Sequence, residues 1–299
     1  MTGWVRTLRT FCPVLRAVIL LSCAIMADHS AIEWTEATWN PTIGCTKVSP
    51  GCDRCYAERI THRFPKTYPN GFDLTLRPDA LELPLQWRRP RTVFVNSMSD
   101  LFHVDVPEAF IARVFGVMQR CPQHPFQILT KRAERLARLA PRLPWPSNVW
   151  MGVSVESPAF AWRIDCLRRV PSAVRFISAE PLLAPLPALN LEGIHWLIAG
   201  GESQAGARPA RDDWFRDLRD QCLGARVAFF LKQLGGHPSK RGGVAAVLDG
   251  QRWTAIPMAI ENAGPIPVQS STLCQKTPSP SGACLPGSNG KVRPYGYSS

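Results

Sequence analysis

Short apolar runs recur along the middle of the chain and predict buried strands. They are rich in β-branched and aromatic residues and almost continuously apolar, as are strands buried on both faces of a parallel sheet. We predict six strands from these runs, over residues 92–95, 126–129, 149–153, 174–177, 194–199 and 227–231.

Amphipathic stretches lie in several of the gaps between these runs and predict helices. A proline opens residues 107–120, a Ser-Pro pair opens 157–169, and an Asp-Asp pair opens 212–223, all of which are typical of helix starts. Shorter helices are predicted over 55–63 and 133–139. Strands that alternate with helices indicate a parallel α/β sheet, either open or closed into a barrel.

Polar or charged side chains follow each predicted strand at once. In an α/β barrel the chemistry lies on the loops after the strands, at one end of the barrel. A polar residue after one strand can mean only that the chain reaches solvent there. Polar residues after six consecutive strands favour a common functional site. The pattern predicts a partial, open TIM-like α/β barrel with a site drawn from Ser97, Asp100, Lys131, Ser154, Glu156, Glu180, Glu202 and Lys232.

Composition suits a folded core, with 45% hydrophobic and 19% charged residues. The net charge of +12 indicates an anionic partner, nucleic acid first. Half of that charge lies in residues 1–25 and 263–299, which hold six Lys and Arg and no acid. The remaining charge on residues 26–262 is common in domains that bind no nucleic acid, so both possibilities stay open.

The two end segments differ in kind from the middle. Residues 1–25 resemble a leader with a basic start, but Arg16 interrupts the apolar run and leaves it too short to span a membrane. Because Met26 opens an ordinary protein start, we interpret 1–25 as a non-native extension, with a true leader as the alternative. Residues 263–299 hold 18 Gly, Pro or Ser and no apolar periodicity, so they are predicted to be disordered. The predicted domain is 26–262, with no membrane partner.

Three of the ten cysteines cluster in one short segment, whereas Cys121, Cys166 and Cys222 stand alone and are expected to be free buried thiols. Cys45, Cys52 and Cys55 have the spacing C-x6-C-x2-C, and a Pro-Gly turn after the first can fold the loop back. Three thiolates with an open fourth position are typical of an iron–sulfur cluster that takes a further ligand. A structural zinc site needs four ligands, and His62 is the candidate for the fourth. Both metals stay open, and a reduced thiolate site favours a cytoplasmic location.

Several motifs resemble those of a known family. The segment 40–57 reads Asn-Pro-Thr-Ile-Gly-Cys-Thr-Lys-Val-Ser-Pro-Gly-Cys-Asp-Arg-Cys-Tyr-Ala and is similar to the signature of the phage-associated three-cysteine-motif proteins. These are uncharacterised proteins of bacteria and phages, related to radical S-adenosylmethionine (SAM) enzymes. The resemblance spans about residues 30–257, and its further matches lie in order at 94–102, 129–132, 152–156, 175–182, 200–203, 230–233 and 248–257.

The resemblance implies a barrel of the radical SAM type. In that superfamily three cysteines hold a 4Fe–4S cluster, SAM binds the fourth iron, and SAM cleavage yields a 5′-deoxyadenosyl radical, so the cofactor carries the chemistry. By strand position, the side chains expected to bind SAM are Ser97 and Asp100 at its amino group and Ser154 and Glu156 at its ribose. The catalytic candidates, expected to face the substrate, are Lys131, Glu180, Glu202 and Lys232.

The cysteine spacing departs from the usual superfamily pattern, which is C-x3-C-x2-C with an aromatic residue before the third cysteine. Here the first gap is six residues, Arg54 precedes Cys55 and Tyr56 follows it. Two function classes therefore stay open. One is a radical SAM-type enzyme of phage or mobile-element context that acts on nucleic acid or a nucleotide. The other is a non-catalytic, metal-stabilised nucleic-acid-binding protein that works with a protein partner encoded nearby.

Overall fold

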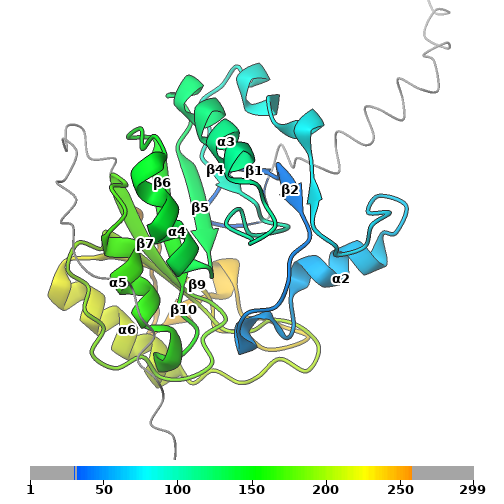
Figure 1. Cartoon of the computed structure of the whole chain (residues 1–299). Coiled ribbons are helices and arrows are strands. Elements are labelled where there is room, and N and C mark those ends of the chain that lie inside the picture. Colours follow the sequence, from blue (N-terminus) through cyan, green and yellow to red (C-terminus); the bar gives the residue numbers. More distant parts are fainter. Residues whose placement is uncertain (1–29, 31, 258–299) are drawn as a thin grey trace, which may run out of the picture.

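The computed structural model describes residues 30 and 32–257, so the predicted extension and tail lie outside the described residues. Within that range, seven parallel strands form one sheet in the order β1-β4-β5-β6-β7-β8-β9. The sheet curls without closing, so the fold is an open α/β half-barrel (Figure 1). Its strands are β1 (Ala37–Trp39), β4 (Val93–Val95), β5 (Phe126–Thr130), β6 (Val149–Ser154), β7 (Val174–Ala179), β8 (Trp196–Gly200) and β9 (Ala228–Gln233).

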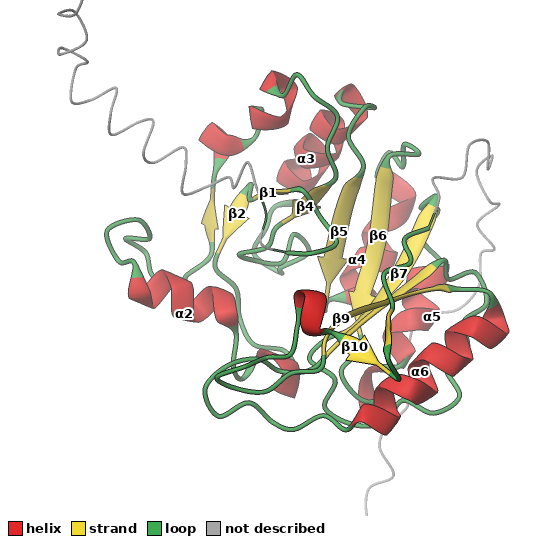
Figure 2. Ribbon diagram, turned by 180° about the vertical axis from the view of Figure 1, so that it is seen from behind, coloured by secondary structure: helices red, strands yellow, loops and turns green. Residues whose placement is uncertain are grey.

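Helices cover the outer side of this sheet (Figure 2). They are α3 (Glu108–Arg120), α4 (Ala133–Leu139), α5 (Trp162–Arg168) and α6 (Asp212–Ala225), whereas α2 (Tyr56–Arg63) lies apart from them. Two antiparallel pairs complete the strands: β2 (Thr42–Ile43) with β3 (Thr75–Leu76), and β10 (Val247–Leu248) with β11 (Gln251–Arg252). The 3-10 turns are η1 (Pro50–Cys52), η2 (Pro78–Ala80), η3 (Leu83–Gln86), η4 (Ala140–Arg142), η5 (Pro158–Phe160) and η6 (Gly243–Ala245).

The six predicted strands and the predicted helices are present, with ends shifted by a few residues. The sequence analysis missed β1, which pairs in parallel with β4 through Ala37, Thr38 and Trp39. Three residues are too few to show a strand pattern. In the described residues, no helix is long and apolar enough to cross a membrane.

The two faces of the sheet carry different cores. On the outer face, aliphatic side chains such as Val95, Ile128 and Met151 pack in one large cluster with the helices. On the concave face, aromatic side chains pack around Trp196, whose ring centroid lies 5.6–6.2 Å from those of Trp34, Trp150, Phe176 and Phe230. These aromatic residues fill the concave face at mid-strand and toward the amino ends.

Strand periodicity then decides what lies at the other end of the concave face. Side chains two positions apart share a face, so inward positions run from the aromatic cluster toward the carboxyl ends of the strands. Those later inward positions are polar or small, and parallel pairing brings them all to one edge. They include most of the predicted site: Lys131, Ser154, Glu156, Glu180, Glu202 and Lys232.

Candidate metal centre at the carboxyl edge

The segment from Gly44 to Cys55, here called the cysteine loop, leaves β2 and ends at the start of α2. Gly44 has φ +82°, and a Cβ there would lie 2.2 Å from the Asp73 carbonyl oxygen, so only glycine fits. Cys45 N–H then donates to the Phe72 carbonyl at 3.1 Å. Cys52 ends the turn η1, and Cys55 is the N-cap residue of α2. All three loop cysteines are free and half-buried.

The three thiols influence one another's charge. Burial raises the pKa of the Cys45 thiol to about 11, the Asp100 carboxylate adds to the rise, and the Arg132 guanidinium opposes it. Burial also raises the pKa of Cys55, against the backbone N–H groups at the start of α2. Charge on Cys52 is a smaller contribution to both rises, as expected where thiols are neighbours.

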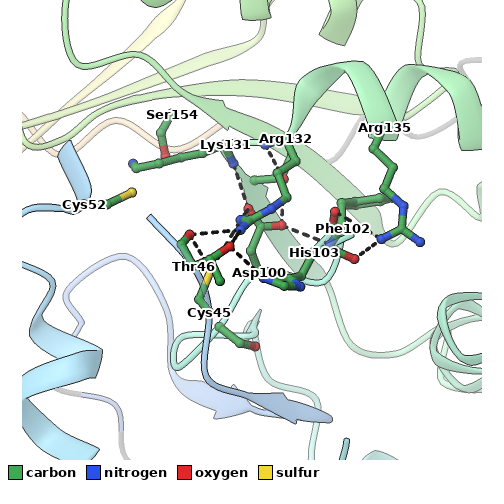
Figure 3. Close-up of polar contacts among 12 residues, drawn as sticks. Cys45, Thr46, Cys52, Asp100, Phe102, His103, Lys131, Arg132, Arg135 and Ser154 are labelled. Carbon is green, nitrogen blue, oxygen red and sulfur yellow. Dashed lines mark hydrogen bonds and ion pairs between the residues drawn. The ribbon is translucent and has the colours of Figure 1, made fainter. Parts of the chain in front are cut away.

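One strand-end acid, Asp100, holds the first part of the cysteine loop through Arg132 (Figure 3). The Arg132 Nη1 group donates to Asp100 Oδ2 at 3.0 Å and to Cys45 Sγ at 3.3 Å. Arg132 Nη2 donates to the carbonyl and the hydroxyl oxygen of Thr46 at 3.0 and 3.1 Å. Asp100 also accepts from the Lys131 N–H, the Phe102 N–H and the Thr130 hydroxyl, so its carboxylate is fully engaged within the protein.

A second acid, Glu156, holds the turn between Cys45 and Cys52. Its side chain is fully buried, accepts from the Ser49 hydroxyl, and pairs with Arg163 Nη1 at 2.8 Å. Gly51 lies against it, since a Cβ at Gly51 would be 2.8 Å from Glu156 Oε1. Glu156 therefore supports the loop from beneath.

A third acid, Glu202, holds the last part of the cysteine loop. Its Oε2 accepts from Arg54 Nη1 at 2.9 Å, and its Oε1 from Arg208 Nη2 at 2.6 Å. Arg208 Nη2 also donates to the Pro50 carbonyl at 2.9 Å. Burial by itself would raise the pKa of Glu202, but the hydrogen bonds from Arg208 and Arg54 outweigh it and lower the pKa. The carboxylate is therefore charged at neutral pH.

The fourth acid, Glu180, differs from these three. It pairs with Lys232 Nζ at 2.6 Å and accepts from Gln233 Nε2 at 3.2 Å, and each side chain of the ion pair is 20% exposed. Tyr56 as a whole is 46% exposed, but burial of its phenol group, and then Cys55 and Glu180, raise the pKa of that phenol. The Glu180–Lys232 pair is the part of the predicted acidic set that stays partly open.

The remaining candidates lie at the same edge. The Ser97 hydroxyl donates to Asn40 Oδ1 at 3.2 Å, and the Ser97 carbonyl accepts from the Tyr56 hydroxyl. Ser154 is 2% exposed at the end of β6, and the pairing of Val153 with Thr130 brings it next to Lys131, as Figure 3 shows. The carboxylates of Asp100, Glu156 and Glu202 contact the cysteine loop and its arginines, and the roles expected of Asp100 and Glu156 at SAM and of Glu202 at the substrate stay predictions.

Sequence reasoning missed the arginines that carry these contacts. The signal that could have found them is an arginine next to a candidate ligand or strand end: Arg54 precedes Cys55, and Arg132 follows Lys131. His103 was also missed. It is 1% exposed, its Nε2 lies 2.9 Å from Thr46 Oγ1, and its Nδ1 accepts the Asp105 N–H. The proton therefore resides on Nε2, which donates to Thr46 and steadies the same loop.

The zinc alternative with His62 is not supported. His62 is exposed and lies seven residues after Cys55, about 10 Å along the helix axis, whereas two ligands on one helix are typically four residues apart. Among residues 30 and 32–257, no three His, Cys, Asp or Glu side chains are placed to hold a single metal ion. Of the isolated cysteines, Cys121 and Cys222 are free and buried as expected, but Cys166 is disulfide-bonded, so a free thiol there was the wrong expectation.

A comparison with protein families adds one finding. The model of a family described as "Protein of unknown function (DUF5131)" matches residues 29–257. No curated protein and no solved structure matches the chain. Because the match covers the cysteine loop and all seven strands of the half-barrel, the chain belongs to the DUF5131 family.

Proposed function

We propose that this protein is an iron–sulfur enzyme of the radical SAM type that acts on nucleic acid or a nucleotide. One observation supports the proposal most strongly. Three free thiols lie on one loop, and three strand-end acids tie that loop to the carboxyl edge of an open parallel half-barrel. That edge is where α/β barrels carry their chemistry.

The donor set suits a cluster better than a single ion. Cys45, Cys52 and Cys55 would hold a 4Fe–4S cluster, with one thiolate on each of three irons. A structural zinc ion needs four ligands, and the candidate for the fourth, His62, is exposed and lies seven residues after Cys55. When bound, the cluster and SAM would supply the one-electron chemistry.

The protein's own residues would position the ligands and exclude water. The Arg132 guanidinium lies 3.3 Å from Cys45 Sγ, so its charge and hydrogen bond favour the thiolate form that a cluster requires. Asp100 and Glu156 are 6% and 0% exposed, and both act behind the loop. Ser97 and Ser154 remain the proposed contacts for SAM, because their hydroxyl groups lie at the same edge without a cationic partner.

The substrate side of the site would use the Glu180–Lys232 pair. Their charged groups lie 2.6 Å apart and are partly exposed, so they can bind a polar substrate and exchange a proton with it. Lys131 extends the same rim toward the cysteine loop. Glu202 keeps a supporting role through Arg54 and Arg208.

The test is anaerobic purification of the full chain with iron and sulfide analysis, followed by addition of SAM. We expect about four irons per chain and an absorbance spectrum that changes with SAM. Alanine at Cys45, Cys52 or Cys55 should abolish iron binding, whereas Cys222→Ala, a buried thiol far from the loop in sequence, should retain it.

Two results would count against the proposal in different ways. One tightly bound zinc ion with no iron would remove the enzyme and favour a metal-stabilised nucleic-acid-binding protein. A cluster whose spectrum ignores SAM would leave the metal site standing and remove the radical SAM type.

A further inference from the structure

A groove of about 670 Å³ runs beside the cysteine loop, between that loop, the segment after β4, and helices α4 and α5. It is separate from the Glu180–Lys232 pair, since neither of those residues lines it. Six of its lining side chains are cationic: Lys131, Arg132, Arg135, Arg138, Arg163 and Arg169.

The positive charge of this groove is not neutralised locally. Glu134 is the one acid among the lining residues. Asp100 and Glu156 pair with Arg132 and Arg163 from beneath, so even with Arg169 left out five cations face three acids. Burial and then the neighbouring charge of Arg138 lower the pKa of Arg135, as expected where cations are crowded together.

Two of the cations are available to a ligand. In the part of the chain that the structure describes, no carboxylate lies within ion-pair distance of the Lys131 or Arg138 side chain. Arg138 is exposed and Lys131 is half-buried, so both side chains can reach a ligand in the groove.

The groove also carries apolar surface between its cations. The half-buried side chains of Phe160 and Trp162 line it, and the Arg163 guanidinium lies 4.3 Å from the centroid of the Phe160 ring. Val104, at the rim, is 70% exposed. Aromatic faces interleaved with cations are the pattern that binds single-stranded nucleic acid, because bases stack on the rings while phosphates meet the cations. An inorganic anion would bind the cations but would make no stacking contact with the aromatic side chains.

We propose that this groove binds a single-stranded nucleic acid, so that the bound strand lies beside the cysteine loop. Lys131 and Arg138 contact phosphates, and the Phe160–Arg163 stack contacts a base. As a statement about the substrate the inference rests on the proposed function. The binding itself needs no cluster, so the metal-free protein tests it separately.

The experiment is fluorescence anisotropy of a labelled oligothymidylate of about 16 nucleotides, near the upper end of site sizes for such grooves, with the full chain. The double variant Lys131→Gln, Arg138→Gln should bind roughly tenfold more weakly at about 0.15 M salt, and its log–log salt slope should be about 1.4 shallower, as for two lost phosphate contacts. Phe160→Leu should bind about fivefold more weakly or worse through lost stacking, with an unchanged salt slope.

The matched control is Arg88→Gln, Arg89→Gln, which removes the same charge from exposed residues before β4, at the opposite edge of the sheet. We expect it to change affinity by less than about twofold, since charges beyond a Debye length are screened. An equal loss of affinity for the oligonucleotide in both double variants would overturn the inference, because binding would then depend on net charge alone. It would also be overturned if duplex DNA or an acidic peptide displaced the oligonucleotide as well as unlabelled single strand does.

Discussion

Replacing Arg132 by glutamine tests how the cysteine loop is held. The Arg132 side chain is 11% exposed and its partner Asp100 is 8% exposed, so this ion pair is largely shielded from water. The same guanidinium donates to both oxygens of Thr46 and to Cys45 Sγ. Arg132→Gln therefore removes the link between the strand end and the loop while leaving the sheet intact.

The magnitude follows from these contacts. Removing one partner of a buried ion pair costs about 3–5 kcal/mol, because the other charge is left uncompensated. Asp100 keeps its bonds from the Phe102 and Lys131 N–H groups and the Thr130 hydroxyl, which favours the lower end of that range. Each lost Thr46 bond adds about 1 kcal/mol. We expect a loss of about 5 kcal/mol in the free energy of unfolding, or roughly 15 °C in Tm.

The assay is a double-mutant cycle with Asp100→Asn, measured by urea denaturation of the reduced, metal-free full chain. Residues in contact should show a coupling energy of about 1 kcal/mol or more. The control is Arg138→Gln, at an exposed arginine of helix α4, which Arg132 precedes; Arg138 has no ion pair among the described residues, and its replacement should cost less than about 0.5 kcal/mol. Additive effects of the two changes would refute the link between the strand end and the loop.

Further changes test other parts of the structure. Gly152→Ala should cost about 1–3 kcal/mol, because its Cβ would lie 2.4 Å from the Phe176 ring, and an unchanged urea midpoint would contradict the packing of the concave face. Glu202→Gln should speed alkylation of the loop thiols severalfold, and an unaltered rate would mean that Glu202 does not hold the loop. Burial and then Arg132 lower the pKa of His103, so its contribution to stability is complete above the unfolded pKa of about 6.5 and is lost as pH falls below it. His103→Gln should accordingly flatten the fall in stability between about pH 7 and pH 5, and an unchanged slope would show that His103 is not involved. In reducing buffer, residues 26–262 should melt within a few degrees of the full chain, and a large loss of Tm would move the domain limits.

Much of the fold could be predicted because its elements are local. Residues 133–139 were expected as a helix and form α4 with those bounds, and 126–129 were expected as a strand and form most of β5. The missed strand β1 shows the limit, since Ala37, Thr38 and Trp39 become a strand only by pairing with β4. The sequence also does not show which strand residues point to the concave face and which to the outer face. Aromatic residues on the concave face and aliphatic residues on the outer face are both apolar, so the strands read as continuous apolar runs.

The candidate site shows the same division between local and tertiary information. The spacing of Cys45, Cys52 and Cys55, the glycine that begins the loop and the acids after the strands could all be identified in the sequence, because each depends on near neighbours. Only the tertiary structure decided which acids hold the loop and which one stays partly open. Glu156 meets Ser49 across 107 positions, and Glu202 meets Arg54 across 148. Such contacts arise when the curled sheet brings its carboxyl edge under the loop, and no spacing in the sequence encodes which arginine will lie between an acid and a thiol.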